Sequence, residues 1–273
     1  MARERVNNPW RQGFALTAED AKALNLVHRM AGDDPITIVV SHDCDMQAAE
    51  KTEPNWEVIP GYFIPKLVGR YTKAKHPRIL HLSLSGGEVL ADAEFDVRNR
   101  LLIPRSKIVG CQPTTIARPS PSERGILQTW LSARYRRSAF ADGFISRFAQ
   151  NNELYSEFEA IIDGTAIHLQ KVCFDVDSGL IVERHDADDA YSLTIHLIFD
   201  VETDPNEAEI AASTAAEKIT ELFKKHFLVD GAWKHIHLIE CWPRAESVFS
   251  LFEHRLYQEW QFDYLSLEDL ESE

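Results

Sequence analysis

The sequence predicts an α+β protein with a curled, barrel-like N-terminal sheet, a central helical segment, and a C-terminal sheet with a helix on one face. Short apolar runs bounded by Gly or Pro fill residues 36–110. Apolar residues then recur at three- and four-residue spacing, and strand patterns return from residue 165 around one long helical pattern. The expected domains are residues 1–111, 112–151 and 152–273.

The N-terminal region is expected to consist mainly of strands. Ile36 to Val40 is a β-branched apolar run, typical of a strand buried on both faces. Residues 79–84 alternate leucine with His81 and Ser83, and Ser85-Gly86-Gly87 should end that strand as a turn. Further strands are expected at residues 56–59, 61–64, 95–103 and 106–109.

The rest of the chain mixes helices and strands. Residues 112–122 contain three prolines and are expected to be a connector, and residues 123–151 are expected to be helical. Asp204-Pro205-Asn206-Glu207 is a typical helix start and predicts a helix that ends near Phe227. Strands are expected at residues 166–175, 180–184, 191–199 and 235–242, the first two joined as a hairpin by Asp177-Ser178-Gly179.

Charge and composition restrict the possible functions. The formal net charge of −14 argues against nucleic-acid binding over the whole surface. Between residues 96 and 148, however, ten Lys and Arg face only three Asp and Glu, so a local positive face is expected. No apolar stretch is long enough for a membrane span and no signal peptide is recognisable, which predicts a cytoplasmic protein without membrane contact. Four scattered cysteines predict free thiols, and we expect neither metal nor cofactor.

The strongest candidate site is Ser41-His42-Asp43-Cys44-Asp45, five polar or reactive residues directly after a buried strand. Cys44 could be a nucleophile with a histidine as base, or His42 could transfer protons on a phosphodiester. His42, Asp43 and Asp45 could instead contribute to a metal site. The structural alternative is that Ser41 or Asp43 caps a helix while Cys44 packs as a small core residue.

Basic residues elsewhere provide candidate phosphate contacts. Arg134 and Arg137 share one face of a helix that also carries aromatic residues, a pattern that favours binding of RNA or a nucleotide. The alternative is that these arginines pair with the acidic second half of the chain. Arg78 and His81 form a second basic group, and His81 would face the same rim as His42 if their strands are neighbours. Histidines in three predicted strands are expected to face solvent: His168, His196 and His237.

The pentad, with Gln12-Gly13 upstream, resembles bacterial proteins that carry a Ser-(His/Gln)-x-Cys-Asp motif after a strand. Those proteins are in turn distantly similar to the PemK/MazF-like barrel toxins. The resemblance covers about residues 10–110 and implies a small SH3-like barrel with metal-independent ribonuclease activity. The chain departs from the toxins in its length and in the Cys-Asp pair, so no toxin catalytic residue is transferred to it.

The leading functional hypothesis is therefore a toxin-like or antiviral-defence effector, a nuclease that acts on RNA or another phosphodiester. Its catalytic residues would be His42, Cys44, Asp45 and His81, and its phosphate contacts Arg78, Arg134 and Arg137. A second hypothesis is a Cys44-dependent hydrolase with a non-nucleic substrate. A third is a non-enzymatic adaptor whose acidic C-terminal half binds a partner protein, such as an antitoxin or another defence component.

Overall fold

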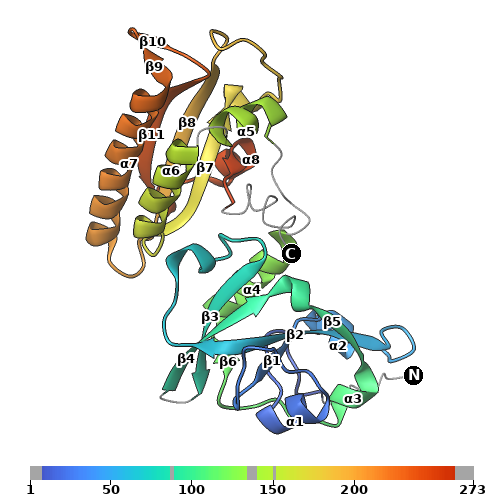
Figure 1. Ribbon diagram of the computed structural model, residues 1–273. Helices are drawn as coiled ribbons and strands as arrows, with labels where there is room; N and C mark the ends of the chain where they lie inside the picture. Colours follow the sequence, from blue (N-terminus) through green and yellow to red (C-terminus); the bar gives the residue numbers. More distant parts are fainter. Residues whose placement is uncertain (1–7, 87–88, 134–139, 150–151, 262–273) are drawn as a thin grey trace. The chain divides into compact units, whose positions relative to one another are not determined.

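The computed structural model describes residues 8–86, 89–133, 140–149 and 152–261 (Figure 1). The chain divides into two compact units, residues 1–135 and residues 136–273, which are described here separately. The boundary falls inside the segment 112–151 that was expected to form a central connector. Its first helix belongs to unit 1 and its second helix to unit 2.

Unit 1 is built on a strongly curled antiparallel sheet, a half-barrel with the strand order β1-β2-β4-β3-β6 (Figure 1). β4 and β5 pair with successive parts of the long strand β2, and the chain bends between them at the 3-10 turn η2 (Val97–Asn99). The strands are β1 (Ile36–Val39), β2 (Asn55–Ile64), β3 (Ile79–Gly86), β4 (Val89–Asp96), β5 (Leu101–Pro104) and β6 (Arg118–Pro119).

The two faces of this sheet bury different cores. The concave face carries Leu80, Leu82 and Leu84 against Trp130 of the helix α4 (Pro121–Ala133). On the opposite face, Trp56 and other apolar residues are covered by short helices. These helices are α1 (Ala18–Ala23), α2 (Asp43–Gln47) and α3 (Arg105–Val109). Neighbouring residues along β1 and β2 point to opposite cores, so apolar residues occur on both faces of these strands.

Three expectations for unit 1 are corrected. The separate strands at 56–59 and 61–64 form the single strand β2, which continues through Pro60. The strand expected at 95–103 is broken at η2. Residues 106–109 are helical, because Arg105 is fixed by its N–H bond to the Pro54 carbonyl and the helix then buries Ile108. Here tertiary packing outweighs the strand propensity of Ile and Val.

Unit 2 contains a four-stranded sheet with the order β11-β8-β7-β12, in which only the β11–β8 pair is parallel. α5 (Asp142–Ala149), α6 (Asn152–Thr165) and α7 (Pro205–Phe227) pack on one face of it (Figure 1). The strands are β7 (Leu169–Val176), β8 (Tyr191–Phe199), β11 (Ile236–Ala245) and β12 (Gln258–Glu259), and a separate hairpin is formed by β9 (Leu228–Val229) and β10 (Ala232–Trp233).

The core of unit 2 is rich in aromatic residues, and the long helix α7 closes it. Phe148 contacts Phe158, Phe174 and Phe223 edge-on or stacked, at centroid distances of 5.3, 6.3 and 5.8 Å. α7 begins as expected, with the Asp204 side chain accepting the Glu207 N–H and a proline in the first turn, and it ends at Phe227. Among the residues described, no helix has the length and apolar character needed to cross a membrane.

Two expectations for unit 2 are wrong. Residues 180–184 form no strand. β7 therefore pairs with β8 and not with residues 180–184 as expected. Of the three histidines expected to face solvent, His168 and His237 are partly exposed. His196 is buried, because the segment from η4 (Glu246–Val248) through α8 (Leu251–Leu256) to Tyr257 covers the outer face of the sheet there.

Candidate functional site

The Ser41–Asp45 turn follows β1, and two of its polar side chains hold the turn in place. The buried Ser41 Oγ accepts the Glu57 N–H at 2.7 Å and fixes the turn to β2. Asp43 Oδ1 accepts the Gln12 N–H, also at 2.7 Å. Met46, one residue after the turn, is fully buried. These contacts correspond to the structural alternative for the pentad, although neither Ser41 nor Asp43 is the helix cap.

The remaining members of the turn, His42, Cys44 and Asp45, are exposed. His42 is the N-cap of α2, and its Nδ1 accepts the Cys44 N–H at 3.2 Å. A neutral imidazole that accepts at Nδ1 carries its proton on Nε2. In this conformation His42 can therefore donate a hydrogen bond to a ligand through Nε2. It can act as a base only if Nδ1 releases its hydrogen bond with the Cys44 N–H.

The upstream Gln12-Gly13 pair is physically joined to the turn. The Gln12 amide donates to the Val40 carbonyl at 2.8 Å, and its Oε1 accepts from Gln128 of α4 at 3.0 Å. Gly13 has φ +86°, and a Cβ at this position would lie 2.8 Å from Pro119 Cγ, so the chain needs glycine here. The turn, the N-terminal segment and α4 thus form one connected region.

His81 lies in a second region, on the sheet face opposite Leu80 and Leu82. It forms a row across three strands with Glu94 of β4 and Tyr62 of β2. His81 Nδ1 accepts the Val68 N–H at 3.1 Å, so Nε2 donates to Glu94 Oε2 at 2.8 Å. The Tyr62 hydroxyl donates to the other Glu94 oxygen.

The electrostatics of this row follow from those bonds. The hydrogen bond from His81 lowers the pKa of Glu94, against the opposing effect of burial. Burial and the hydrogen bond to Glu94 raise the pKa of Tyr62 to about 12, so the phenol stays protonated at neutral pH. Since both ring nitrogens of His81 are bonded within the chain, this geometry favours a positioning role for His81 over proton transfer to a ligand.

The segment around His81 is also basic. Residues 58–87 contain five Lys and Arg and no Asp or Glu. The loop between β2 and β3 carries these cations, which are Lys66, Arg70, Lys73, Lys75 and Arg78. Aromatic side chains lie among them: Tyr71 contacts the His81 ring at 5.0 Å, and His28 stacks on Tyr62 at 4.9 Å.

Several of the cations expected to form a positive face between residues 96 and 148 are bonded within the chain. Arg98 pairs with Asp96, and Arg100 pairs with Glu57. Arg147 belongs to unit 2 and donates to four carbonyl oxygens of its loops. Arg134 and Arg137 lie outside the described residues. The expected cations are therefore divided between the two units.

Charge separates along the unit boundary instead. Residues 1–135 contain 18 Lys and Arg and 15 Asp and Glu, which leaves 11 and 28 of the chain's 29 and 43 for residues 136–273. Unit 1 is thus slightly basic and unit 2 strongly acidic. Any interaction with polyanions is favoured for unit 1 and disfavoured for unit 2.

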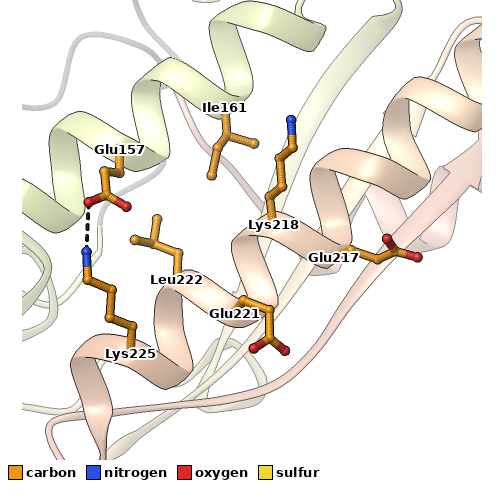
Figure 2. A pocket seen from close by; sticks show the side chains of 7 residues that line it. All are labelled: Glu157, Ile161, Glu217, Lys218, Glu221, Leu222 and Lys225. Carbon is orange, nitrogen blue, oxygen red and sulfur yellow. Dashed lines mark hydrogen bonds and ion pairs between the residues drawn. The ribbon is translucent and has the colours of Figure 1, made fainter.

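Unit 2 contains a shallow groove between α6 and α7, with Ile161 and Leu222 at its floor and charged residues around it (Figure 2). Next to it, ligand atoms of Glu153, Glu157 and His226 lie within 4.8 Å of one another. The Lys225 ammonium already bonds both carboxylates, at 2.8 and 2.9 Å, as Figure 2 shows for Glu157. This contact offsets one of the two carboxylate charges that would attract a cation and occupies an oxygen of each carboxylate.

The residues proposed from the sequence thus fall into two groups. His42, Cys44 and Asp45 lie together on one turn, and Arg78 and His81 lie together at the start of β3. β1 and β3 are not neighbours, because β2 and β4 lie between them. Sequence reasoning missed Glu94 and Tyr62, whose pairing depends on strand register. It also missed the acid-free stretch, which a count of charges would have revealed.

No protein-family model matches the chain, and no curated protein matches it significantly. The resemblance to PemK/MazF-like toxins therefore depends on the motif residues alone.

Proposed function

We propose that unit 1 binds RNA or another phosphodiester and acts on it, as a toxin-like or defence effector would. The observation that carries this proposal is the acid-free segment 58–87, in a chain of net charge −14. Four of its five cations are exposed or partly exposed, whereas Lys75 is buried, and several aromatic residues lie among them. Cations contact phosphates, while aromatic rings stack with unpaired bases. Arg78 belongs to this segment, in agreement with its expected role as a phosphate contact.

The implied SH3-like barrel belongs to the same proposal. Residues 13–16 run along the free edge of β1, with Gly13 donating to the Val39 carbonyl and Leu16 donating to the Thr37 carbonyl. Ala15 in turn accepts the Thr114 N–H at 2.8 Å, close to β6 at the other edge of the sheet. These contacts support a barrel closed at this seam.

In the proposed chemistry, cations hold the phosphate and an exposed side chain of the Ser41–Asp45 turn supplies the reacting group. His42 would donate an Nε2–H hydrogen bond to a phosphate oxygen and stabilise the negative charge that develops there, because its Nδ1 holds the helix cap. The exposed Asp45 carboxylate of the same turn would take the proton of the attacking hydroxyl group. The new P–O bond forms as the bond to the leaving oxygen breaks, and the leaving oxygen takes up the proton from Asp45. We propose no metal and no cofactor for this reaction.

The binding step is tested by titrating the full chain with single-stranded RNA at several salt concentrations. The Lys66→Ala, Arg78→Ala double variant should bind several-fold more weakly, and the slope of log K against log[salt] should fall by about 1.4 for two lost phosphate contacts. Lys51→Ala is the matched control, an exposed lysine between Glu50 and Glu53. Equal losses in both variants, or no RNA binding, would contradict the proposal.

The catalytic step needs a separate measurement. RNA cleavage by the purified protein should persist in EDTA and be lost in Asp45→Asn, while His42→Ala should retain RNA affinity and lose most of the rate. Loss of cleavage in EDTA would rule out the metal-independent route. If RNA is bound but stays intact under all conditions, unit 1 is a binding module only.

A second candidate function rests on the charge of unit 2. With 28 acidic and 11 basic residues, this unit is suited to bind a basic protein partner, as an adaptor would. The complex should then assemble through unit 2 and dissociate as salt rises. A partner that binds equally well at low and high salt would argue against this function.

A further inference from the structure

The structure contains an arginine–phenylalanine cluster that neither candidate function uses. Phe14 lies at the end of the turn that begins at Arg11, with the Phe14 N–H donating to the Arg11 carbonyl. The guanidinium carbons of Arg118 and Arg124 lie 4.9 and 5.5 Å from the centre of its ring. Arg118 comes from β6 and Arg124 from the first turns of α4, so three distant segments meet here.

These two arginines differ from the arginines that form ion pairs. Arg98, Arg100, Arg184 and Arg244 each pair with a carboxylate. Within the described residues, neither Arg118 nor Arg124 has such a partner: Arg118 Nε donates to the Thr114 carbonyl at 3.1 Å, and Arg124 Nε is buried without an acceptor. In a protein with 43 acidic residues, two adjacent guanidiniums without counter-ions are unexpected.

The surroundings of the cluster favour an anion. Both side chains are only partly exposed, and stacking against Phe14 restricts the guanidinium groups to fewer orientations. The preceding residue Ser120 accepts the Glu123 N–H through its hydroxyl, so the positive end of the thirteen-residue helix α4 adds to the same potential. Arg donors in a fixed fork match the oxygens of a phosphoryl group.

We propose that Arg118, Arg124 and Phe14 form a phosphoryl-binding site, whose ligand is a nucleotide or the phosphate of a nucleic-acid strand. The site lies beside the Ser41–Asp45 turn, because Gln12, two residues before Phe14, donates to Asp43. It is distinct from the β2–β3 loop and does not depend on RNA binding by that loop.

Calorimetric titration of the full chain tests the assignment with four probes: inorganic phosphate, adenosine 5′-monophosphate, adenosine and a short single-stranded RNA. Phosphate-bearing probes should bind and adenosine should not. Arg124→Ala is the main variant, because the Arg124 side chain makes no hydrogen bond within the described structure and its removal leaves the fold intact. It should weaken binding of the monophosphate at least about tenfold, the loss expected for one charge-assisted contact.

Further variants separate charge from geometry. Arg124→Lys should restore only part of the affinity, since lysine keeps the charge but lacks the planar fork. Phe14→Leu keeps the packing volume and should also weaken binding, because it removes the ring that orients both guanidiniums. Arg98→Ala, at an exposed arginine paired with Asp96, is the matched control and should leave affinity unchanged.

The outcomes distinguish this inference from the proposed function. If the monophosphate binds wild type and Arg124→Ala equally, or binds neither, the assignment is overturned. The Lys66→Ala, Arg78→Ala variant should retain monophosphate binding, and loss of binding there would place the phosphate on the loop instead. In the Lys66→Ala, Arg78→Ala variant, stronger binding of RNA than of monophosphate identifies the strand as the ligand of this site, whereas equal binding identifies the free nucleotide.

Discussion

Unit 2 contains a buried histidine that should make its stability depend on pH. His196 is 6% exposed, its ring stacks on Tyr257 at 4.4 Å, and its Nδ1 has no hydrogen-bond partner among the described residues. Burial lowers its pKa to about 4, assisted by the positive charge of Arg244 and opposed by Glu253. A proton on this ring would lie under the segment that covers the sheet.

The direction of the effect follows from proton linkage. Above pH 6.5 the ring is neutral in the folded and the unfolded chain. Between pH 6.5 and about pH 4 the unfolded chain binds a proton that the folded chain excludes, so stability falls as pH falls. At 1.36 kcal/mol per pKa unit the full loss is at most about 3 kcal/mol, and most of it occurs by pH 5. Allowing for screening by water, we expect about 1 to 2 kcal/mol between pH 7 and pH 5.

The assay is denaturant unfolding of wild type and His196→Gln at pH 7 and pH 5, followed by fluorescence. Other carboxylates titrate in both proteins, so the difference between the two pH dependences isolates His196. Glutamine keeps a polar side chain that does not titrate, and it should remove that part of the pH dependence. The reasoning is refuted if the two proteins lose equal stability, or if nuclear magnetic resonance shows His196 half-protonated near pH 6.5.

Three further outcomes are expected. Gly61→Ala should destabilise unit 1 by about 1 to 3 kcal/mol in thermal unfolding, because the added Cβ would lie 2.4 Å from the Glu94 carbonyl oxygen. An unchanged unfolding temperature would mean that β4 can move aside. Iodoacetamide at neutral pH should modify the exposed Cys44 in the folded protein but not Cys173, because burial raises the pKa of the Cys173 thiol to about 12. An inert Cys44 would remove the thiol-hydrolase alternative. Asp204→Ala should cost about 1 kcal/mol through loss of the α7 cap, measurable as a lower unfolding midpoint with an unchanged denaturant slope.

The elements that could be predicted from sequence are those whose pattern is set locally. α7 has its cap, its proline and its apolar stripe within one continuous segment, and β1 and β8 are strongly apolar runs. Residues 106–109 were assigned incorrectly because their helix depends on Arg105 and its bond to Pro54 of another segment. The false hairpin at Asp177 shows the same limit: a turn sequence does not specify which strand becomes the partner.

The site was predictable only in part, for a related reason. The position of the Ser41–Asp45 turn followed from the end of an apolar strand, whereas the sequence left open whether Cys44 is exposed or packs in the core. Asp43 and Ser41 hold the turn in place by accepting hydrogen bonds from the backbone N–H groups of Gln12 and Glu57, respectively. Sequence spacing does not indicate that these two residues lie next to the turn. Likewise, His81 was noticed as a titratable residue, but the Glu94 and Val68 contacts that occupy it depend on strand register and loop path.

The hydrogen bond between Ala15 and Thr114 has a consequence for biosynthesis. Ala15 leaves the ribosome early, whereas its partner Thr114 is synthesised only after every strand of the sheet except β6. Until then the outer edge of β3, and the outer edge of the segment 13–16 that covers β1, remain unpaired on a nascent chain that already carries most of the apolar residues of unit 1. Such intermediates are prone to associate with other chains. We therefore expect unit 1 to fold late during translation, and truncation before Thr114 to yield insoluble protein.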